Sequence, residues 1–500
     1  MNIAKKVLSK EVLCALAGAA SLAASAGSAF LMEARPSSDW FTRGVVYQVQ
    51  PRAFSSEGTL KAIEAKLPYL KDLGVTIVYL VPVMEMDDDR DKSFWSPRQI
   101  RSGFDNPKNQ YRLKDYFHVD PEYGTDADLK ALVATAHRLG LKVIFDLVYF
   151  HAGPGAKVWK EHPEFTAWNA DGTIAKGQWR FPRFNFRVPG VKEYLWGNMT
   201  WLIRDYDVDG YRCDVGDGVP LDFWCEGVRR MKAVKADAIL LCEGSNEQDQ
   251  VTAFDADYGW FPGGGVVAGK DSAQVIRRSW EGREKRNVQG ARFVNHYENH
   301  DIATDSRPRR EQAWGAAAID QVLVWMFTID GVPMLFTGNE MADADPKHSM
   351  FGKTPMDWAQ LGREPGKSRH ALVKELAALR AGHAAFTDLN GRDGLSWLDV
   401  TATNSVTAFV RRAKDGKQIV VVQNWKNAAV TTDVSFAVAP EPVPSYLAAE
   451  RVDRSVKGVL AAKPLLSRGA EKTGDRSFRL APYGFAVYEV EKAKQTNGER

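Results

Sequence analysis

Short apolar runs alternate with longer amphipathic segments over most of this 500-residue chain. Eight runs have the length and the β-branched or aromatic content of strands, at 45–50, 76–83, 143–149, 210–215, 238–243, near 253–257, 292–296 and 333–337. Stretches with helical periodicity lie between or after them, including 126–139, 191–206, 320–329 and 369–381. Alternating strands and helices predict parallel βαβ units, and eight units predict an α/β fold of the closed (β/α)8 type, the TIM barrel.

Two long excursions interrupt this alternation, and the pattern changes after the barrel. Residues 84–126 form a polar, aromatic region, and the Gly/Pro/Trp-rich residues 152–186, after the third strand, are too long for an ordinary βα loop. Beyond about residue 387 the chain shows short alternating strands, at 405–411, 418–423, 478–480 and 485–489. We therefore expect a catalytic barrel over 39–386, a short inserted domain over 152–186, and an antiparallel β-sandwich over 387–491.

The N-terminus has the pattern of a secretory signal. Lys5, Lys6 and Lys10 precede an Ala-rich apolar stretch at 12–29 that ends in small residues. This pattern predicts a signal peptide over residues 1–29 and a secreted or periplasmic protein. An uncleaved membrane anchor is the alternative, although Ala and Ser make the stretch weakly hydrophobic. No other stretch approaches a membrane span, so no stable membrane insertion is expected after cleavage.

Composition narrows the choice of partners. The formal charge is only +3 and no dense Lys/Arg block occurs, so nucleic acid is not expected as a partner. Fifteen Trp and fifteen Tyr mildly favour carbohydrate, whose flat apolar faces suit aromatic rings. Cys213, Cys225 and Cys242 remain after the signal. Because side chains alternate along a strand, Cys213 and Cys242 should point outward into the helix layer, as free thiols rather than a disulfide.

Charged and polar residues gather where four apolar runs end. Asp146 and His151 lie toward and just beyond the end of the third strand, Arg212 and Asp214 lie near the end of the fourth, Glu243 ends the fifth, and His300 and Asp301 follow the seventh. The carboxyl ends of barrel strands meet at one face, where the site of such a barrel lies. Two or three carboxylates in one cleft are what cleavage of a glycosidic bond requires.

Each segment also has a plain structural interpretation. Arg212 and Asp214 share one strand face, so the arginine can keep the carboxylate ionised as a nucleophile, or the two can form a structural ion pair. Glu243 ends an apolar strand, which favours a raised pKa and a general acid, but such a residue can also be a cap or salt-bridge partner. His300 and Asp301 could similarly form a helix cap or bind a metal. Their joint occurrence favours a site.

These segments resemble the four main motifs of the α-amylase family of glycoside hydrolases, family 13. The resemblance covers about residues 44–381 and continues more loosely to the C-terminus. It implies a retaining mechanism, with carboxyl groups of the nucleophile and acid roughly 5–5.5 Å apart. The implied catalytic residues are the nucleophile Asp214, the acid/base Glu243 and the transition-state stabiliser Asp301. The implied substrate-binding residues are Tyr111, which stacks under the sugar, Arg212, which orients the nucleophile, and His151 and His300, which donate hydrogen bonds.

The expected function is hydrolysis of α-glucosidic bonds in an α-glucan or maltooligosaccharide substrate through a covalent glycosyl-enzyme. A transglycosylase, or a sucrose- or trehalose-directed enzyme, would use the same residues. A catalytically silent binding homologue is less favoured because all three acids are present. A plain sugar-binding barrel has no feature in its favour.

Four residues depart from the family pattern. In calcium-binding members, oxygen ligands stand where this chain has Phe150 and Arg183. A phenyl ring cannot ligate calcium and a guanidinium repels it, so we expect neither a metal at that site nor a cofactor, and Arg183 could replace the ion electrostatically. Asp217 stands in place of a Lys-His pair that contacts the leaving group. Arg112 replaces an Asp that grips the terminal sugar in some exo-acting members.

Overall fold

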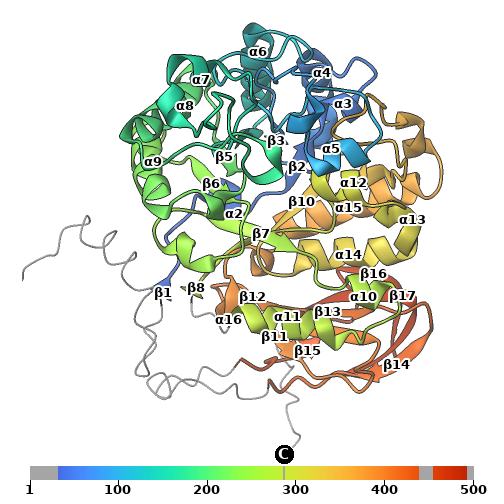
Figure 1. Cartoon of the computed structure of the whole chain (residues 1–500). Coiled ribbons are helices and arrows are strands. Elements are labelled where there is room, and N and C mark those ends of the chain that lie inside the picture. The colour runs from blue at the N-terminus through green and yellow to red at the C-terminus, as the bar shows by residue number, and fades with distance from the viewer. Residues whose placement is uncertain (1–31, 285–287, 439–453, 492–500) are drawn as a thin grey trace, which may run out of the picture.

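The computed structural model describes residues 32–284, 288–438 and 454–491, and its centre is a closed barrel of eight parallel strands (Figure 1). The strands are hydrogen-bonded in the order β10-β2-β3-β4-β5-β6-β7-β9. Their bounds are β2 Val46–Val49, β3 Ile77–Leu80, β4 Lys142–Leu147, β5 Gly210–Cys213, β6 Ile239–Cys242, β7 Ala256–Trp260, β9 Phe293–His296 and β10 Val332–Phe336. The predicted TIM barrel is confirmed. The largest shift is in the sixth strand, which lies at Ala256–Trp260 rather than near 253–257.

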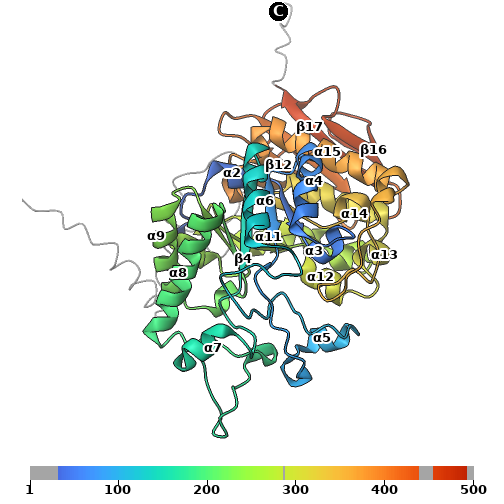
Figure 2. The ribbon, with the colours of Figure 1, turned by 90° about the horizontal axis from the view of Figure 1, so that it is seen from above.

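Helices surround the barrel on the outside (Figures 1 and 2). The long ones are α4 Leu60–Asp72, α6 Asp126–Arg138, α8 Pro189–Tyr206, α9 Leu221–Val234, α11 Gln274–Glu284, α14 Ala316–Thr328 and α15 Gly366–Gly382. The shorter elements are β1 Met32–Glu33, α2 Asp39–Thr42, α3 Pro51–Phe54, α10 Gly264–Val267, β8 Val288–Gln289, α12 His300–Asp305, α13 Arg310–Trp314 and α16 Gly391–Gly394. The start of α6 shows how the sequence sets these bounds: Thr125 and Asp128 form a reciprocal capping box.

Alternation along the strands separates the interior of the barrel from the helix layer. On β6, Leu241 belongs to the apolar cluster inside the barrel, whereas Cys242 belongs to the cluster between strands and helices. Tyr211 and Cys213 of β5 face the same outer cluster. The predicted outward direction of the two cysteines is confirmed, and Cys213, Cys225 and Cys242 are all free of disulfides.

Two segments project from the carboxyl-terminal face of the barrel. One carries α5 (Pro97–Arg101) and comes from the first long excursion, and the other is the predicted insert at 152–186, which carries α7 (Lys157–Glu161) (Figure 2). The insert is joined to the end of β4 by a bridge between His151 and Arg183. Both segments therefore stand where side chains beyond the strand ends can meet them.

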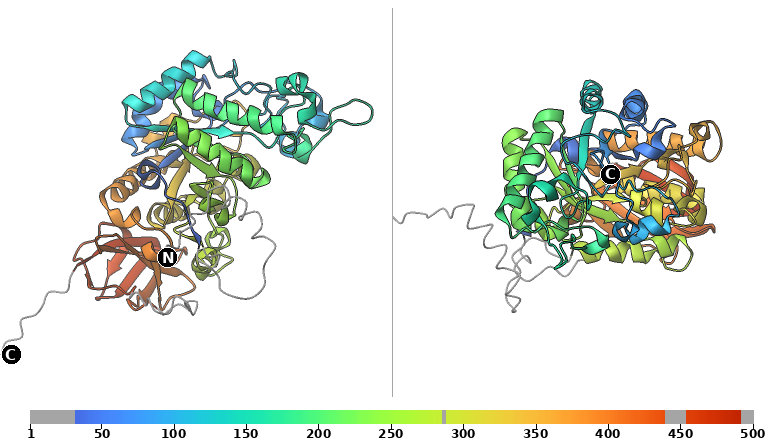
Figure 3. Two further views of the ribbon diagram at one scale, coloured as in Figure 1. Left: turned by 90° about the vertical axis from the view of Figure 1, so that its left-hand side faces the viewer. Right: turned by 45° about the horizontal axis from the view of Figure 1, so that its top comes forward.

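The C-terminal part, for which an antiparallel β-sandwich was predicted, is an antiparallel sheet domain whose seven described strands are connected by pairing; it is seen below the barrel in the left view of Figure 3. Its strands are β11 Leu395–Leu398, β12 Val406–Arg412, β13 Gln418–Asn424, β14 Val430–Asp433, β15 Val459–Leu460, β16 Leu466–Lys472 and β17 Ser477–Glu491. The prediction of separate strands at 478–480 and 485–489 was wrong. Tyr483 bends the chain with φ 50°, but β16 pairs with both halves across a bulge, so β17 continues as one strand.

The predicted signal peptide, residues 1–29, lies outside the described residues. Among the helices that the structure describes, none combines the length and apolar character needed to span a membrane.

Candidate active site

A cavity of about 360 Å³ opens at the carboxyl ends of the barrel strands. It is lined by Ser96, Pro97, Arg98, Arg101, Asn109, Tyr111, His151, Trp179, Phe181, Asp214, Val215, Glu243, His300, Asp301, Met350 and Phe351. Six of the seven predicted site residues belong to this lining. The seventh, Arg212, is fully buried beneath it. The site residues that were inferred from separate strand ends therefore meet in one place.

Arg212 connects three of the acids from below. Its Nη1 donates to Asp146 at 2.7 and 2.9 Å and to Oδ1 of Asp214 at 2.9 Å. Its Nη2 forms an ion pair with Oε2 of Glu243 at 2.7 Å. The register of β4 and β5 places Asp146 directly beside Arg212. The sequence indicated the pair with Asp214, and the structure adds the other two carboxylates.

Burial dominates the electrostatics of the three proposed catalytic acids. It raises the pKa of Asp214, Glu243 and Asp301, and the positive charge of Arg212 acts in the opposite direction for each of them. The backbone N–H of Val215 donates to Oε2 of Glu243 at 2.9 Å, which also favours the ionised form. A cavity with several buried carboxyl groups can keep a proton on one of them while another is ionised, as acid catalysis and nucleophilic attack together require.

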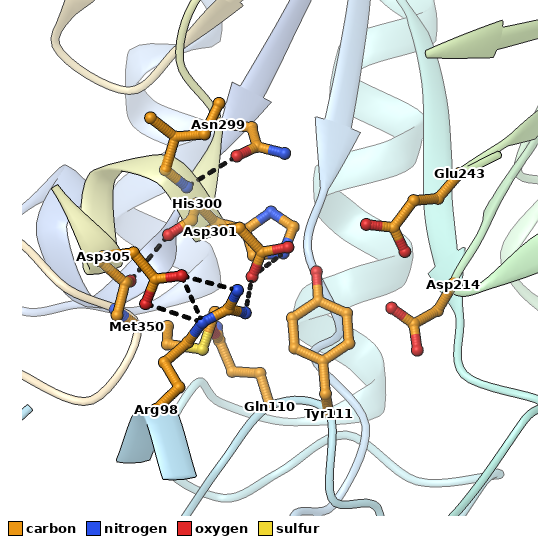
Figure 4. Close-up of polar contacts among 12 residues, drawn as sticks. Arg98, Gln110, Tyr111, Asp214, Glu243, Asn299, His300, Asp301, Asp305 and Met350 are labelled. Carbon is orange, nitrogen blue, oxygen red and sulfur yellow. Dashed lines mark hydrogen bonds and ion pairs between the residues drawn. The ribbon is translucent and has the colours of Figure 1, made fainter. Parts of the chain in front are cut away.

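His300 and Tyr111, both labelled in Figure 4, form a stacked pair in the lining of the cavity. Their ring centroids are 4.9 Å apart and their planes differ by 16°. The hydroxyl of Tyr111 donates to Oδ2 of Asp146 at 2.7 Å. Gln48 accepts from the backbone N–H of His300 through its oxygen, so its NH₂ group faces Nδ1 of that ring at 2.9 Å. Nε2 of His300 therefore carries the proton and can donate to a ligand.

His151 belongs to the same lining, close to the proposed nucleophile. Its Nε2 is 2.8 Å from the backbone oxygen of Tyr111 and 4.0 Å from Oδ2 of Asp214. Burial lowers the pKa of His151 to about 4, so the ring is neutral near neutral pH. Because Nε2 faces a carbonyl oxygen, that atom holds the proton and donates it to Tyr111, so the unpartnered Nδ1 of the neutral ring is an acceptor.

Arg98 is a further charged residue of the cavity lining that the sequence did not reveal. It lies on α5 and forms ion pairs with Asp301 and, at 2.9 Å, with Asp305, which is one turn further along α12 (Figure 4). The Arg98 guanidinium opposes the effect of burial on the pKa of Asp301 more than any other charge does. In the sequence, only its position in the long excursion at 84–126 could have pointed to Arg98 as a site residue, because no motif contains it.

Two departures from the family pattern contact each other. The guanidinium of Arg183 lies 4.0 Å above the ring of Phe150. A phenyl ring and a guanidinium offer no oxygen to a cation, so these residues do not fit a calcium ion at the position that the resemblance implies. They form a cation–π contact instead.

The other two departures lie away from the cavity. Arg112 is fully buried, donates to the backbone oxygens of Asp87 and Asp89 at 3.2 and 2.6 Å, and is not part of the lining. Arg112 therefore offers no contact to a sugar in the cavity. Asp217 is exposed and also absent from the lining.

A parallel barrel with clustered carboxylates beyond its strand ends fits the requirements of a glycoside hydrolase. Comparison with known proteins agrees: residues 37–171 match the model described as "Alpha amylase, catalytic domain". This match and the relatives described next support the α-amylase family as the family of this chain.

Several curated relatives are similar over most of the chain. A cyclomaltodextrinase of Geobacillus thermopakistaniensis is 25% identical, over 91% of this chain and 78% of the relative. Neopullulanase 2 of Thermoactinomyces vulgaris is 26% identical, over 77% and 70%. Among solved structures, a maltogenic α-amylase of Thermotoga neapolitana has a TM-score of 0.69 at 22% identity and covers 90% of this chain and 97% of that one. That structural likeness supports the fold.

Proposed function

We propose that this protein hydrolyses α-glucosidic bonds in maltooligosaccharides or related α-glucans with retention of configuration. The observation that carries the proposal is the arrangement of Asp214 and Glu243 around one buried arginine, with Asp301 in the same cavity. The names of the relatives, cyclomaltodextrinase and neopullulanase, support an α-glucan as substrate.

In the first step, a carboxylate oxygen of Asp214 attacks the anomeric carbon and the glycosidic C–O bond breaks. The leaving oxygen takes the proton of Glu243, whose raised pKa keeps that proton available. The negative charge of Asp301 stabilises the positive charge that develops on the sugar ring. Arg212 holds Asp214 in place through the hydrogen bond to Oδ1, which directs the other oxygen, Oδ2, away from the arginine.

In the second step, the Glu243 carboxylate takes a proton from water as the water oxygen attacks the anomeric carbon. The bond to Asp214 then breaks, and its carboxylate is restored. Two displacements at one carbon give net retention. His300, neutral and with its proton on Nε2, is placed to donate a hydrogen bond to a sugar hydroxyl group, whereas the Nε2 proton of His151 is donated to the backbone oxygen of Tyr111 in this structure.

The test uses maltoheptaose and follows the anomeric form of the new reducing end by proton NMR during the first minutes of reaction. Retention is expected, and an inverted product would overturn the assignment of Asp214. Asp214→Asn and Glu243→Gln should each abolish activity. Asp217→Asn is the matched control, because this exposed carboxylate follows the same strand but lies outside the cavity lining, and its activity should stay near that of the parent.

Transfer of sugar to another sugar, or action on a trehalose-type linkage, is a second candidate. A malto-oligosyltrehalose trehalohydrolase of Deinococcus radiodurans is 26% identical over 60% of this chain. Chains longer than maltoheptaose among the products would indicate transfer. A panel with sucrose, trehalose and trehalose-capped maltooligosaccharides would identify the other linkages.

The proposal extends to export and to metal independence. The basic and apolar N-terminus supports secretion or periplasmic location, and sequencing the N-terminus of the exported protein tests it, with cleavage expected near residue 26 or 29. The contact between Phe150 and Arg183 supports activity without calcium at that position.

A further inference from the structure

One tryptophan at the cavity has an unusual backbone. Trp179 lines the cavity and is 38% exposed, which is high for so large an apolar side chain. Its φ is 54°, and the φ of the next residue, Arg180, is 72°. Two consecutive non-glycine residues in the left-handed region are strained, and such strain persists where the surroundings hold it and where it serves a site.

The surroundings of Trp179 form a tight, supported turn. The N–H of Gly177 donates to the backbone oxygen of Phe181 at 2.8 Å, which closes the turn around the tryptophan. A Cβ on Gly177 would lie 2.4 Å from Cγ of Arg183, so only glycine lets the turn pack this closely on the arginine. The turn is therefore seated on the same arginine that covers Phe150.

Aromatic contacts then fix the indole at the edge of the cavity. Its ring centroid is 5.9 Å from that of Phe150 and 5.7 Å from that of His151, and both pairs are edge-to-face. His151 is itself 4.0 Å from Asp214. His151 is thus the one side chain between the indole and the proposed nucleophile. On its other side the indole contacts Phe150, which in turn contacts Arg183.

We propose that Trp179 is a sugar-stacking residue that binds the glucose unit next to the one attacked by Asp214, and so favours longer α-glucan chains. This inference rests on the function proposed above. The indole offers a flat apolar surface to a pyranose ring, and burial of both surfaces releases water. Phe150 and Arg183 are then positioning residues, because they support the indole and do not line the cavity.

The insert provides a matched control. Trp168 is 45% exposed in the same segment, but its Nε1 donates to the backbone oxygen of Pro163 at 2.7 Å and its ring is not part of the cavity lining. A tryptophan lost from the surface of the insert can therefore be compared with a tryptophan lost from the cavity.

The experiment measures kcat and KM on maltotriose and maltoheptaose for the parent, Trp179→Ala, Trp179→Gly, Trp179→Phe and Trp168→Ala. The glycine variant removes the ring but accepts the positive φ, so it separates loss of stacking from disturbance of the turn. The alanine and glycine variants should lose about tenfold in kcat/KM on maltoheptaose, mainly through KM, which corresponds to the loss of one ring contact. The loss should be smaller on maltotriose, the phenylalanine variant should keep most of the efficiency, and Trp168→Ala should match the parent.

Equal KM values for Trp179→Gly and Trp168→Ala at both chain lengths would overturn the inference. Binding separates its failure from failure of the proposed function. In a Glu243→Gln background, titration with maltoheptaose should change tryptophan fluorescence, and Trp179→Phe should remove most of that change. If the fluorescence of Glu243→Gln changes equally with and without the added Trp179→Phe substitution, only the role of Trp179 is overturned. A parent protein that neither binds nor cleaves maltoheptaose overturns both proposals.

Discussion

Glu340 is a fully buried carboxyl group outside the cavity lining, and it gives the protein a predictable pH dependence of stability. It follows β10 and accepts hydrogen bonds from Tyr47 at 3.0 Å and Tyr69 at 3.2 Å. Burial raises its pKa to about 7, from an ordinary value of 4.5. The native state therefore holds this proton more tightly than the unfolded chain does.

The sign and size follow from linkage. As pH rises past 4.5 the unfolded chain ionises Glu340 first, so stability falls until the native group ionises near pH 7 and is level above it. Relative to low pH, where Glu340 is protonated in both states, the free energy of unfolding is lower by about 1.4 kcal/mol at pH 5.5 and by about 3.4 kcal/mol at pH 8.5. Glu340→Gln removes this titration while its amide can still hydrogen-bond both tyrosines. The difference in free energy of unfolding between variant and parent should thus favour the variant by about 2 kcal/mol more at pH 8.5 than at pH 5.5.

Urea unfolding of parent and variant at the two pH values, followed by circular dichroism, measures this difference. Glu311→Gln is the matched control: Glu311 is also buried, but it pairs with Arg369 at 3.0 Å. That variant leaves Arg369 without its main charge partner and should be less stable than the parent at both pH values. A Glu340→Gln effect that is the same at pH 5.5 and pH 8.5 would refute the raised pKa.

Three further predictions concern the site and its surroundings. Arg98→Ala should move the acid limb of the pH profile of kcat/KM to higher pH, because Asp301 loses the cation that lowers its pKa. Arg98→Lys keeps a positive charge and should move the limb less. An unmoved limb in Arg98→Ala would exclude an effect of Arg98 on the pKa of Asp301. A chelator should leave the melting temperature unchanged, since Phe150 and Arg183 cannot hold calcium, whereas removal of an ion present at 100 times its Kd would cost about 2.7 kcal/mol. Arg112 also forms a buried ion pair with Asp87 at 3.6 Å, so Arg112→Ala should lower the free energy of unfolding by about 3–5 kcal/mol, measured by urea unfolding. Its product pattern on maltoheptaose should stay that of the parent, and a changed pattern at parental stability would contradict the buried position.

The barrel and its acids could be predicted because both leave local marks in the sequence. A strand buried on both sides is a continuous apolar run, and the first charged residue after it, such as Asp214 or Glu243, stands at the face where sites lie. The continuous strand β17 could not be predicted, because its halves are held together by pairing with β16, a contact between distant segments. Arg98 was invisible for the same reason. Its role depends on the folding of an irregular segment over Asp301.

At the position implied for calcium, we propose that Arg183 takes the place of the cation without coordination. A bound ion would link the end of β4 to the insert, but a backbone hydrogen bond already joins these segments: Phe184 donates to Phe150 at 3.3 Å, and within the insert Ala152 donates to Pro182 at 3.1 Å. The guanidinium of Arg183 then adds a permanent positive charge that stacks on a ring rather than binding oxygens. Because stacking depends on the ring, Phe150→Leu should loosen the insert and raise KM, whereas added calcium should restore nothing. Rescue of that variant by calcium would show that the site still binds the ion.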